Sequence, residues 1–289
     1  LKNAGLIRYP GLFKLYASFA VDEGEIQPGI WDLNTLYDYH ALVNMMSPSS
    51  KRSVVTIMIP EGSSCRQIFQ LLQEKRVCTV EALENYAASG ELGDYWFLEG
   101  ITRGDKYCLE GYLFPDTYEF YLNEKPASAI KRLLDNFNRK MTEERMQAVE
   151  ESGYSLKEII TIASLIEKET DGTDHAKIAS VIYNRLNDSG SHGTYKMLNI
   201  DAALLYALPD HEGALTNADK KVDSPYNLYT HAGLPPTPIA NPGIASIDAA
   251  LHPETTDYYY YALGKDGKHH FSTTLSEHNA FLASGDYGG

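Results

Sequence analysis

Residues 156–186, LKEIITIASLIEKETDGTDHAKIASVIYNRL, decide the fold of this chain. The first half carries apolar residues on nearly every face of a helix, and such a helix belongs inside a domain core; these residues are Ile159, Ile160, Ile162, Ala163, Leu165 and Ile166. The turn Asp171-Gly172-Thr173 follows, and Asp174 is placed to cap a second helix. The stretch therefore predicts a helical hairpin around which the rest of the chain packs.

Charged residues gather at the bend of this hairpin, in the segment Glu167-Lys168-Glu169-Thr170. A carboxylate that leaves a buried helix and enters a cleft is partly desolvated, which favours its protonated form. A carboxyl group that holds a proton near neutral pH can act as a general acid. Glu167 is therefore a candidate catalytic acid. The alternative is an ordinary hairpin that ends in a solvated charge cluster.

The charge balance of the 289 residues limits the classes of partner. The chain has 25 Lys and Arg against 39 Asp and Glu, which gives a formal net charge of -14. Such an acidic surface argues against nucleic acid or an anionic membrane face as a direct partner. Hydrophobic residues make up 43%, as in folded globular proteins. The 21 tyrosines against 9 phenylalanines indicate many half-exposed aromatic positions, which suit a cleft that binds sugars but also occur on ordinary protein surface.

No metal or cofactor is expected. The cysteines show neither metal-ligand spacing nor a CxxC pattern; they are Cys65, Cys78 and Cys108. Adjacent histidines in a strand point to opposite faces, so only one of His269 and His270 could join His278. No carboxylate or cysteine stands at a recognised ligand spacing beside these three histidines.

Two similar strand-turn-helix units lie in the first hundred residues. The first is predicted as a strand at residues 30–33 and a helix at residues 39–46, and the second as a strand at residues 54–59 and a helix at residues 65–72. The helical segments DYHALVNMM and SCRQIFQLL share their apolar positions. A repeat of this size resembles a LysM-type module, a small fold that often binds cell-wall glycans containing N-acetylglucosamine.

We therefore expect an α+β protein with a LysM-like strand-turn-helix module over residues 1–100 and a larger, mainly helical unit over residues 101–289. Helices are predicted at residues 6–19, 80–89, 127–149 (one helix or a pair), 247–251 and 276–281, and a β-hairpin at residues 258–272. Asn199 and Asp201 stand before another short helix, which Asp201 could cap.

Two irregular segments carry polar groups. Residues 109–120, LEGYLFPDTYEF, suit a rigid loop and strand, in which Glu110 and Glu119 are either second carboxylates of a site or anchors for the loop backbone. Residues 224–246 contain five prolines and cannot be regular structure. Long ordered loops are more often functional than not. We expect this loop to border the same cleft as Glu167; its polar array is Tyr226, Asn227, Tyr229, His231 and Asn241.

Taken together, these segments make the chain similar to the YceG-like family of endolytic murein transglycosylases. The matching segments run in family order over about two thirds of the chain: LEGYLFPDTYEF (109–120), IASLIEKET (162–170), ASVIYNRL (179–186), the Asp201 segment, SPYN (224–227), GLPPTPIANPG (233–243) and HFSTTLSEHN (270–279). Two positions depart from the family pattern, because Asn199 stands where a Gln is common and Thr237 where a Gly is usual.

The resemblance implies a lytic cut of the β-1,4 bond between N-acetylmuramic acid and N-acetylglucosamine, which leaves a 1,6-anhydromuramoyl end. The family's acid falls on Glu167, which would act first as acid and then as base. Tyr226, Asn227 and Asn241 would position the substrate together with Asn199 and Asp201. Lys168, Glu169 and Glu110 would support the acid from behind.

The resemblance also implies partners and a location. Peptidoglycan strands are the expected substrate, and cell-wall synthesis proteins such as penicillin-binding proteins are possible partners. No run of 18 apolar residues occurs in the sequence, which also lacks an initiator Met. We therefore expect a single-pass membrane anchor upstream and a catalytic domain outside the cytoplasm.

Two other functions are compatible with parts of the sequence. A non-catalytic protein that binds cell-wall glycans would carry the LysM-like repeat without needing an acid at position 167. An aminodeoxychorismate lyase, an older label for this family, would need pyridoxal phosphate on a lysine. No lysine in the sequence lies in a phosphate-binding pattern.

Overall fold

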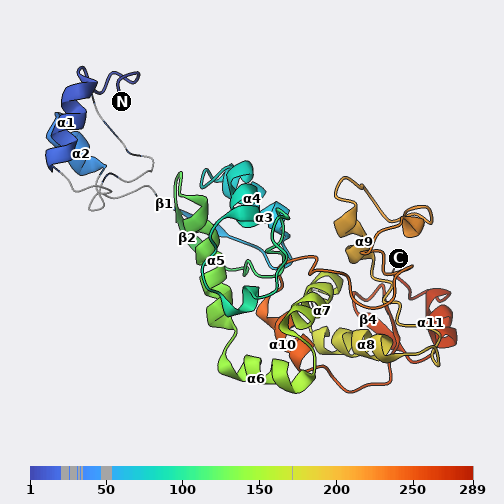
Figure 1. Cartoon of the computed structure of the whole chain (residues 1–289). Helices are drawn as coiled ribbons and strands as arrows, with labels where there is room; N and C mark the ends of the chain where they lie inside the picture. The colour runs from blue at the N-terminus through green and yellow to red at the C-terminus, as the bar shows by residue number, and fades with distance from the viewer. Residues whose placement is uncertain are drawn as a thin grey trace.

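The computed structural model describes residues 1–20, 26, 31, 33, 35–46, 54–170 and 172–288. Two hydrophobic cores are present in this part of the chain. A small core joins α1 (Pro10–Ala20) to α2 (Tyr39–Met45), and a large core extends over residues 57 to 251. Figure 1 shows the α1–α2 pair at one end of the molecule and the large core as its main body.

The first helix starts later than the sequence pattern indicates. Residues 6–19 were expected to be helical, but α1 begins at Pro10. Proline fixes its own φ for a first helical turn and disfavours helical backbone at the residue before it, so the helix cannot extend back to residue 6. The predicted helix at residues 39–46 is confirmed by α2. The predicted strand at residues 30–33 includes residues outside the described part of the chain.

The second predicted strand-turn-helix unit is confirmed. β1 (Val54–Met58) leads through a turn into α3 (Cys65–Glu74), and α4 (Val80–Ser89) follows. A capping box, in which Ser64 and Gln67 satisfy each other's backbone N–H groups, fixes the start of α3. The expected helix at residues 80–89 therefore also has the predicted bounds.

β1 pairs with a strand from beyond residue 100. β2 (Thr117–Tyr121) lies antiparallel to it, with Val54 opposite Tyr121 and Met58 opposite Thr117. A second two-stranded sheet is the predicted β-hairpin of β3 (Tyr260–Leu263) and β4 (His269–Ser272). Helices with two small sheets confirm the α+β class. The LysM-like character of the first hundred residues and a domain boundary at residue 100 stay predictions.

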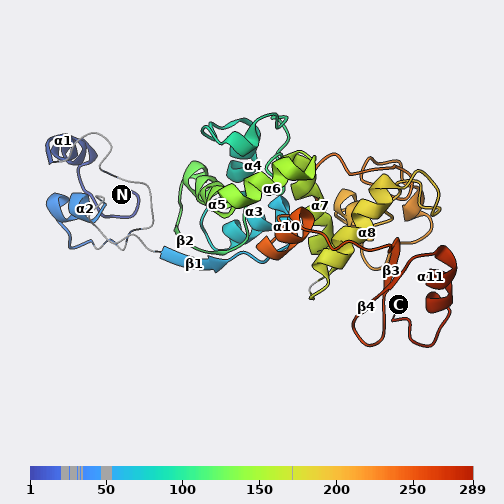
Figure 2. The same ribbon diagram turned by 90° about the horizontal axis from the view of Figure 1, so that it is seen from below.

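The helical hairpin lies at the centre of the large core, as predicted. α7 (Leu156–Glu169) and α8 (His175–Asn187) pack against each other and against α10 (Ile244–Leu251), as Figures 1 and 2 show from two sides. All six apolar residues named for the first helix are fully buried. The cap differs from the prediction. Asp174 occupies the N-cap position of α8 but makes no capping hydrogen bond, because Thr170 and His269 bind its carboxylate instead.

The remaining elements surround this hairpin. They are η1 (Trp96–Leu98), α5 (Pro126–Lys140), α6 (Glu143–Ser152), α9 (Asp201–Ala207), η2 (Asp219–Lys221) and α11 (Leu275–Leu282). The predicted helix or pair at residues 127–149 is a pair, because Thr142 caps a new helix. The helix predicted at residues 247–251 already begins at Ile244. Within the described residues, no helix has the length and apolar character needed to cross a bilayer.

Candidate active site

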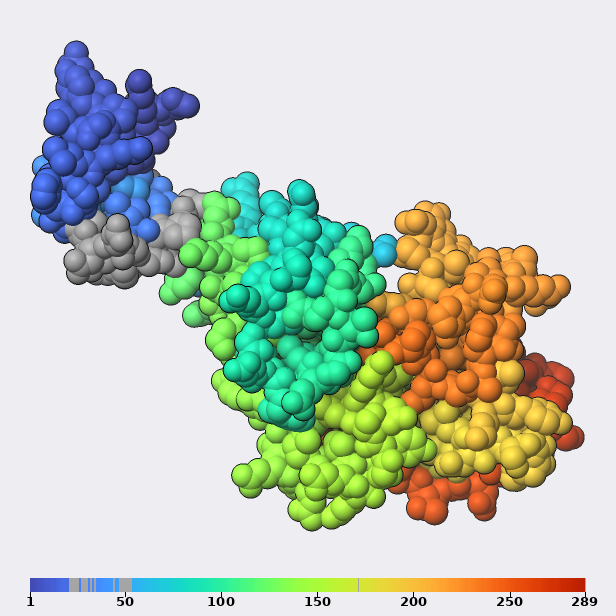
Figure 3. Space-filling model, viewed as in Figure 1, coloured from blue at the N-terminus to red at the C-terminus, as the bar shows by residue number. Residues whose placement is uncertain are grey.

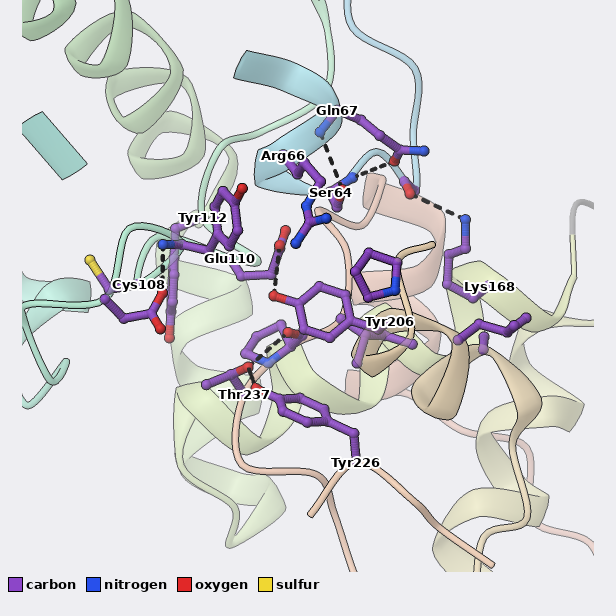
Figure 4. A pocket seen from close by; sticks show the side chains of 18 of the residues that line it. Ser64, Arg66, Gln67, Cys108, Glu110, Tyr112, Lys168, Tyr206, Tyr226 and Thr237 are labelled. Carbon is purple, nitrogen blue, oxygen red and sulfur yellow. Dashed lines mark hydrogen bonds between the residues drawn. The ribbon is translucent and has the colours of Figure 1, made fainter. Parts of the chain in front are cut away.

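A cleft of about 830 Å³ opens beside the hairpin. Its walls come from the start of α3, the loop before β2, α9 and residues 224–246, called the proline-rich loop below. In Figure 3 these segments meet at the notch between the blue-green and orange parts of the surface. Four tyrosines line it, as Figure 4 shows for three of them: Tyr107, Tyr112, Tyr206 and Tyr226. Flat aromatic rings beside polar groups suit a sugar chain.

Glu167 lies in the last turn of α7. It does not itself line the cleft, but it lies beside Gly62 and Lys168, which do. Its half-buried carboxylate accepts hydrogen bonds on Oε2 from the backbone N–H of Gly243 (2.9 Å) and the hydroxyl of Ser246 (2.7 Å). Oε1 makes no hydrogen bond to any residue that the structure describes. Gly62 and Lys168, which border the cleft, flank the acid, and a Cβ on Gly62 would lie 3.3 Å from Cγ of Glu167.

The two residues that follow Glu167, Lys168 and Glu169, face different surroundings. Lys168 is exposed at the edge of the cleft, and its Nζ donates to the carbonyl oxygen of Gly62 at 3.3 Å. Glu169 points to the β-hairpin and accepts a 2.6 Å hydrogen bond from the hydroxyl of Tyr261. Burial raises the pKa of Glu169, and this hydrogen bond opposes the shift. The carboxylates of Glu167 and Glu169 thus bind different groups: Glu167 binds Gly243 and Ser246, and Glu169 binds Tyr261.

Glu110 is a buried anchor in the wall of the cleft. Its carboxylate accepts hydrogen bonds from the backbone N–H of Cys65 (2.9 Å), the amide of Asn241 (2.9 Å) and the hydroxyl of Tyr206 (3.1 Å; Figure 4). Burial raises the pKa of Glu110 to about 7, although these hydrogen bonds oppose the shift. Glu119, the other candidate second carboxylate, is exposed on β2.

The raised pKa of Glu110 predicts how stability depends on pH. Because the folded state holds this proton up to about pH 7 and the unfolded chain only to about 4.5, stability should be highest below pH 4.5 for this group and should fall as the pH rises through 7. The loss is on the order of 3 kcal/mol. Glu110→Gln should remove this part of the pH dependence, because a glutamine side chain does not ionise. The fold should be kept, because the glutamine amide can donate to Tyr206 while its oxygen accepts from Cys65 and Asn241.

Urea unfolding of both proteins between pH 5 and pH 8 measures this effect. The difference in unfolding free energy between Glu110→Gln and the parent should grow in favour of the variant as the pH rises. A difference that stays constant over that range would contradict the shift. Glu119→Gln is the matched control, since it removes an exposed carboxylate and should leave the pH dependence unchanged.

Asn241 joins three segments of the site. Its side-chain oxygen accepts from the backbone N–H groups of Gly111 (3.0 Å) and Leu113 (2.8 Å), and its amide donates to Glu110 and to the carbonyl oxygen of Ser63. Its backbone forms an isolated β-bridge with Ser63. Asn241 is fully buried, so these contacts hold the proline-rich loop against α3 and the loop before β2. A direct contact of Asn241 with substrate stays a prediction.

The other loop residues divide into buried and cleft-facing groups. Asn227 is fully buried, and its amide donates to the carbonyl oxygens of Lys220 (3.1 Å) and Val222 (2.8 Å). Tyr226 lines the cleft, where its hydroxyl lies 2.7 Å from Oγ1 of Thr237. Thr237, one of the two departures from the family pattern, therefore occupies cleft wall. The structure brings the loop to Glu167 through Gly243, as described above.

Asn199 and Asp201 lie at the start of α9, and neither lines the cleft. Asn199 is exposed with a φ of +55°, a left-handed conformation that Asn tolerates better than most residues. Asp201 is the first residue of α9 and not its cap, since Ile200 occupies the N-cap position. The Asp201 carboxylate instead accepts a hydrogen bond from Tyr229 and lies 3.7 Å from Nζ of Lys220. Substrate binding by either residue stays a prediction.

The sequence pattern missed three residues next to the acid. Gly243 and Ser246 bind Glu167, and the carboxylate of Glu61 lies against Gly243, where an added Cβ would be 2.0 Å from its Oε1. Glu61 stands in a turn and Ser246 near the start of α10, so neither belongs to a periodic pattern. The described residues contain no group of three or more metal-ligating side chains that could hold a metal ion.

The model of the YceG-like family matches residues 1–284, and the chain belongs to this family. Its relatives include proteins named endolytic murein transglycosylase. The protein of that name from Bacillus subtilis (strain 168) is 32% identical, over 96% of this chain and 78% of that protein. The protein of that name from Streptococcus pneumoniae serotype 2 (strain D39 / NCTC 7466) is 27% identical over 98% of this chain, which spans 55% of that protein.

A solved structure has the same fold. The crystal structure of a yceG-like protein from Listeria monocytogenes matches with a TM-score of 0.68 and 29% sequence identity. The match covers 97% of this chain and 93% of the Listeria chain, so the similarity extends over the whole architecture.

Proposed function

We propose that this chain is an endolytic murein transglycosylase that cleaves the β-1,4 bond between N-acetylmuramic acid and N-acetylglucosamine with Glu167 as its single acid and base. The observation that carries the proposal is the state of the Glu167 carboxylate. One oxygen is held by Gly243 and Ser246, and the other makes no hydrogen bond within the described residues. A fixed carboxyl group with one available oxygen suits proton transfer in both directions.

The reaction would take place in two steps. Glu167 donates its proton to the glycosidic oxygen as the bond from C1 of the muramoyl sugar to that oxygen breaks, with the N-acetyl group stabilising the positive charge at C1. The C6 hydroxyl of the same sugar then attacks C1 and returns its proton to Glu167. The products are a free 4-hydroxyl on N-acetylglucosamine and a 1,6-anhydromuramoyl end, and no water is consumed. One carboxylate suffices, unlike in most glycosidases.

Mass spectrometry of purified glycan strands after incubation with the protein tests this proposal. We expect internal cuts that yield fragments with anhydromuramoyl ends. Fragments with reducing muramoyl ends, which are heavier by one water, would mean hydrolysis. Binding to the strands without any new ends would favour the non-catalytic glycan-binding protein.

The charges of the cleft add a specific expectation about the substrate. Three cations, Arg66, Lys157 and Lys168, line the cleft together with three acidic residues, Asp105, Glu110 and Asp210. None of the three cations has a carboxylate within ion-pairing distance in the described part of the chain. The guanidinium of Arg66 lies over the ring of Tyr107, 5.3 Å from its centroid. Unpaired cations in a protein of net charge -14 suit the carboxylates of peptides attached to muramic acid.

Arg66→Gln is therefore expected to raise KM about tenfold for glycan strands that carry their peptides, because a hydrogen bond to a charged group is lost at a partly exposed position. kcat should change little, and strands stripped of peptides should be cleaved equally by both proteins. Steady-state release of fragments measures both constants. Arg8→Gln, in the α1–α2 part of the chain, is the control. Equal KM values for Arg66→Gln and the parent on both substrates would contradict the assignment.

The proposed activity also sets the location and partners. Murein lies outside the cytoplasm, so the catalytic part would act there, and a membrane anchor would hold it close to new strands. Proteins that synthesise the strands, such as penicillin-binding proteins, would be its neighbours. Both statements follow from the substrate and rest on the proposed function.

A further inference from the structure

The four tyrosines of the cleft differ in how much of their ring is available to a ligand. Tyr112 is buried, and its ring stacks on that of Phe97 with the centroids 5.8 Å apart. The ring of Tyr107 is engaged by two cations, because the guanidinium of Arg66 lies 5.3 Å and Nζ of Lys106 4.9 Å from its centroid. These two rings are therefore already occupied by contacts within the protein.

Tyr206 and Tyr226, called the tyrosine pair below, have freer rings. Both side chains are half-buried, and each packs against the large core while it lines the cleft. Their ring centroids lie 5.2 Å apart with an interplanar angle of 50°. Within the described residues, no other aromatic ring and no cation contacts either of them. Figure 4 shows the pair in the cleft, with Tyr206 directed to Glu110 and Tyr226 to Thr237.

The hydroxyl groups of the pair are used to hold the rings in place. Tyr206 donates to Oε2 of the buried Glu110 at 3.1 Å. The Thr237 hydroxyl donates to the carbonyl oxygen of Pro238 at 3.0 Å, so its oxygen accepts the proton of Tyr226 at 2.7 Å. A tyrosine hydroxyl has one proton to donate. A ligand therefore meets two fixed aromatic rings whose hydroxyl protons are already bound.

The wall that holds Tyr226 is attached to the helix of the candidate acid. Just after Thr237, the backbone N–H of Ile239 donates to Oγ of Ser164 at 3.1 Å. Ser164 is fully buried in α7, one helical turn before Glu167. The tyrosine pair and the acid thus belong to one connected wall, so a ligand held by the pair keeps a fixed place relative to Glu167.

The chemistry of the tyrosine pair fits the apolar face of a pyranose ring. A β-linked N-acetylglucosamine has all its ring substituents equatorial, so its C–H groups point to the two faces of the ring, where the negative face of an aromatic ring attracts them. Polar side chains able to bind its hydroxyl and acetamido groups line the same cleft; they are Gln67, Gln70, Asp105 and Asp210. Muramic acid carries a bulky lactyl ether on C3, whereas N-acetylglucosamine has a hydroxyl there and fits more easily between two rings.

We propose that Tyr206 and Tyr226 form a stacking subsite for an N-acetylglucosamine unit of the glycan strand. The choice of this sugar rests on the proposed function, because it is the unsubstituted sugar of the proposed substrate. The subsite binds the strand and takes no part in proton transfer. Its loss therefore acts on KM and leaves kcat nearly unchanged.

The first test measures steady-state release of fragments from purified glycan strands. Leucine removes the aromatic face, so Tyr206→Leu and Tyr226→Leu should each raise KM about tenfold with little change in kcat. Tyr226→Phe keeps the ring and should have a KM within about twofold of the parent value. Tyr195→Leu, which removes an exposed tyrosine outside the cleft, is the control. A variant that folds poorly would lose apparent kcat and not raise KM, so misfolding cannot imitate the expected result.

The second test locates the sugar directly. In protein labelled with fluorotyrosine, the ¹⁹F signals of Tyr206 and Tyr226, each assigned by its absence in the corresponding Phe variant, should shift when soluble oligosaccharides of β-1,4-linked N-acetylglucosamine are added. The Tyr195 signal should stay in place, because this side chain lies outside the cleft.

The outcomes separate this inference from the proposed function. Parent-like KM values for both Leu variants, or ¹⁹F shifts of the pair caused by free stem peptides and not by the oligosaccharides, would overturn the subsite while the proposed function stands. Shifts of the pair with the oligosaccharides in a parent protein that releases no anhydromuramoyl ends would overturn the proposed function and support the subsite.

Discussion

Glu167→Gln is expected to abolish cleavage of glycan strands while the protein stays folded. Glutamine keeps the shape of the side chain, and its oxygen can still accept from Gly243 and Ser246. It has no proton to give to the leaving oxygen, and it cannot take the proton of the C6 hydroxyl. General acid–base catalysis contributes on the order of a hundred- to ten-thousand-fold, and because both steps are affected the loss should be near the upper end.

Release of anhydromuramoyl fragments measures the loss, and circular dichroism shows whether the fold is retained. Glu169→Gln is the matched control, because it removes a carboxylate two residues away that contacts Tyr261 instead of the cleft. That variant should keep measurable activity. Fragment release at the parent rate by a folded Glu167→Gln protein would mean that another group is the acid.

Asn241→Ala is expected to give the largest loss of stability among single changes in the site. The substitution leaves the backbone N–H groups of Gly111 and Leu113 without their acceptor and takes one donor from the buried Glu110 carboxylate. Buried polar groups without partners cost about 1 to 3 kcal/mol each. We therefore expect the free energy of unfolding to fall by about 3 to 5 kcal/mol.

Urea unfolding at pH 7 measures this change. Asn217→Ala is a suitable control, because Asn217 is exposed and its side chain makes no hydrogen bond within the described residues. It should change the unfolding free energy by less than about 0.5 kcal/mol. A similarly small effect of Asn241→Ala would show that the loop is held by other contacts. Activity should fall with stability, since the same loop supplies the Gly243 N–H to Glu167.

The central hairpin could be predicted because its signal is local and repeated. A helix with apolar residues on every side has one stable environment, the core, and α7 is buried accordingly. Its ends were less certain, because capping depends on competing contacts. Asp174 illustrates this limit: its carboxylate is turned to Thr170 and to His269, which is remote in sequence, and it makes no hydrogen bond to the helix N-terminus.

The site was only partly predictable, for two physical reasons. Irregular backbone has no internal partners for its N–H and C=O groups, so a buried loop needs side chains to bind them. Asn227 and Asn241 do this, although the sequence alone favours them as surface groups for sugars. The second reason is that the acid is bound by Gly243 at the start of α10, and Glu61 lies against that same glycine; no spacing in the sequence encodes these contacts between remote segments.

The pairing of β1 with β2 restricts how this protein can be recombined. β1 supplies one strand of a sheet whose other strand lies beyond residue 101, and the first N–H of α3 binds Glu110. A chimera joined at residue 100 to a foreign binding module would expose an unpaired strand edge and leave a buried carboxylate without that donor. The smallest block that can be exchanged intact therefore extends at least from β1 through β2, and α3 or α4 cannot be replaced separately from the strands that flank them.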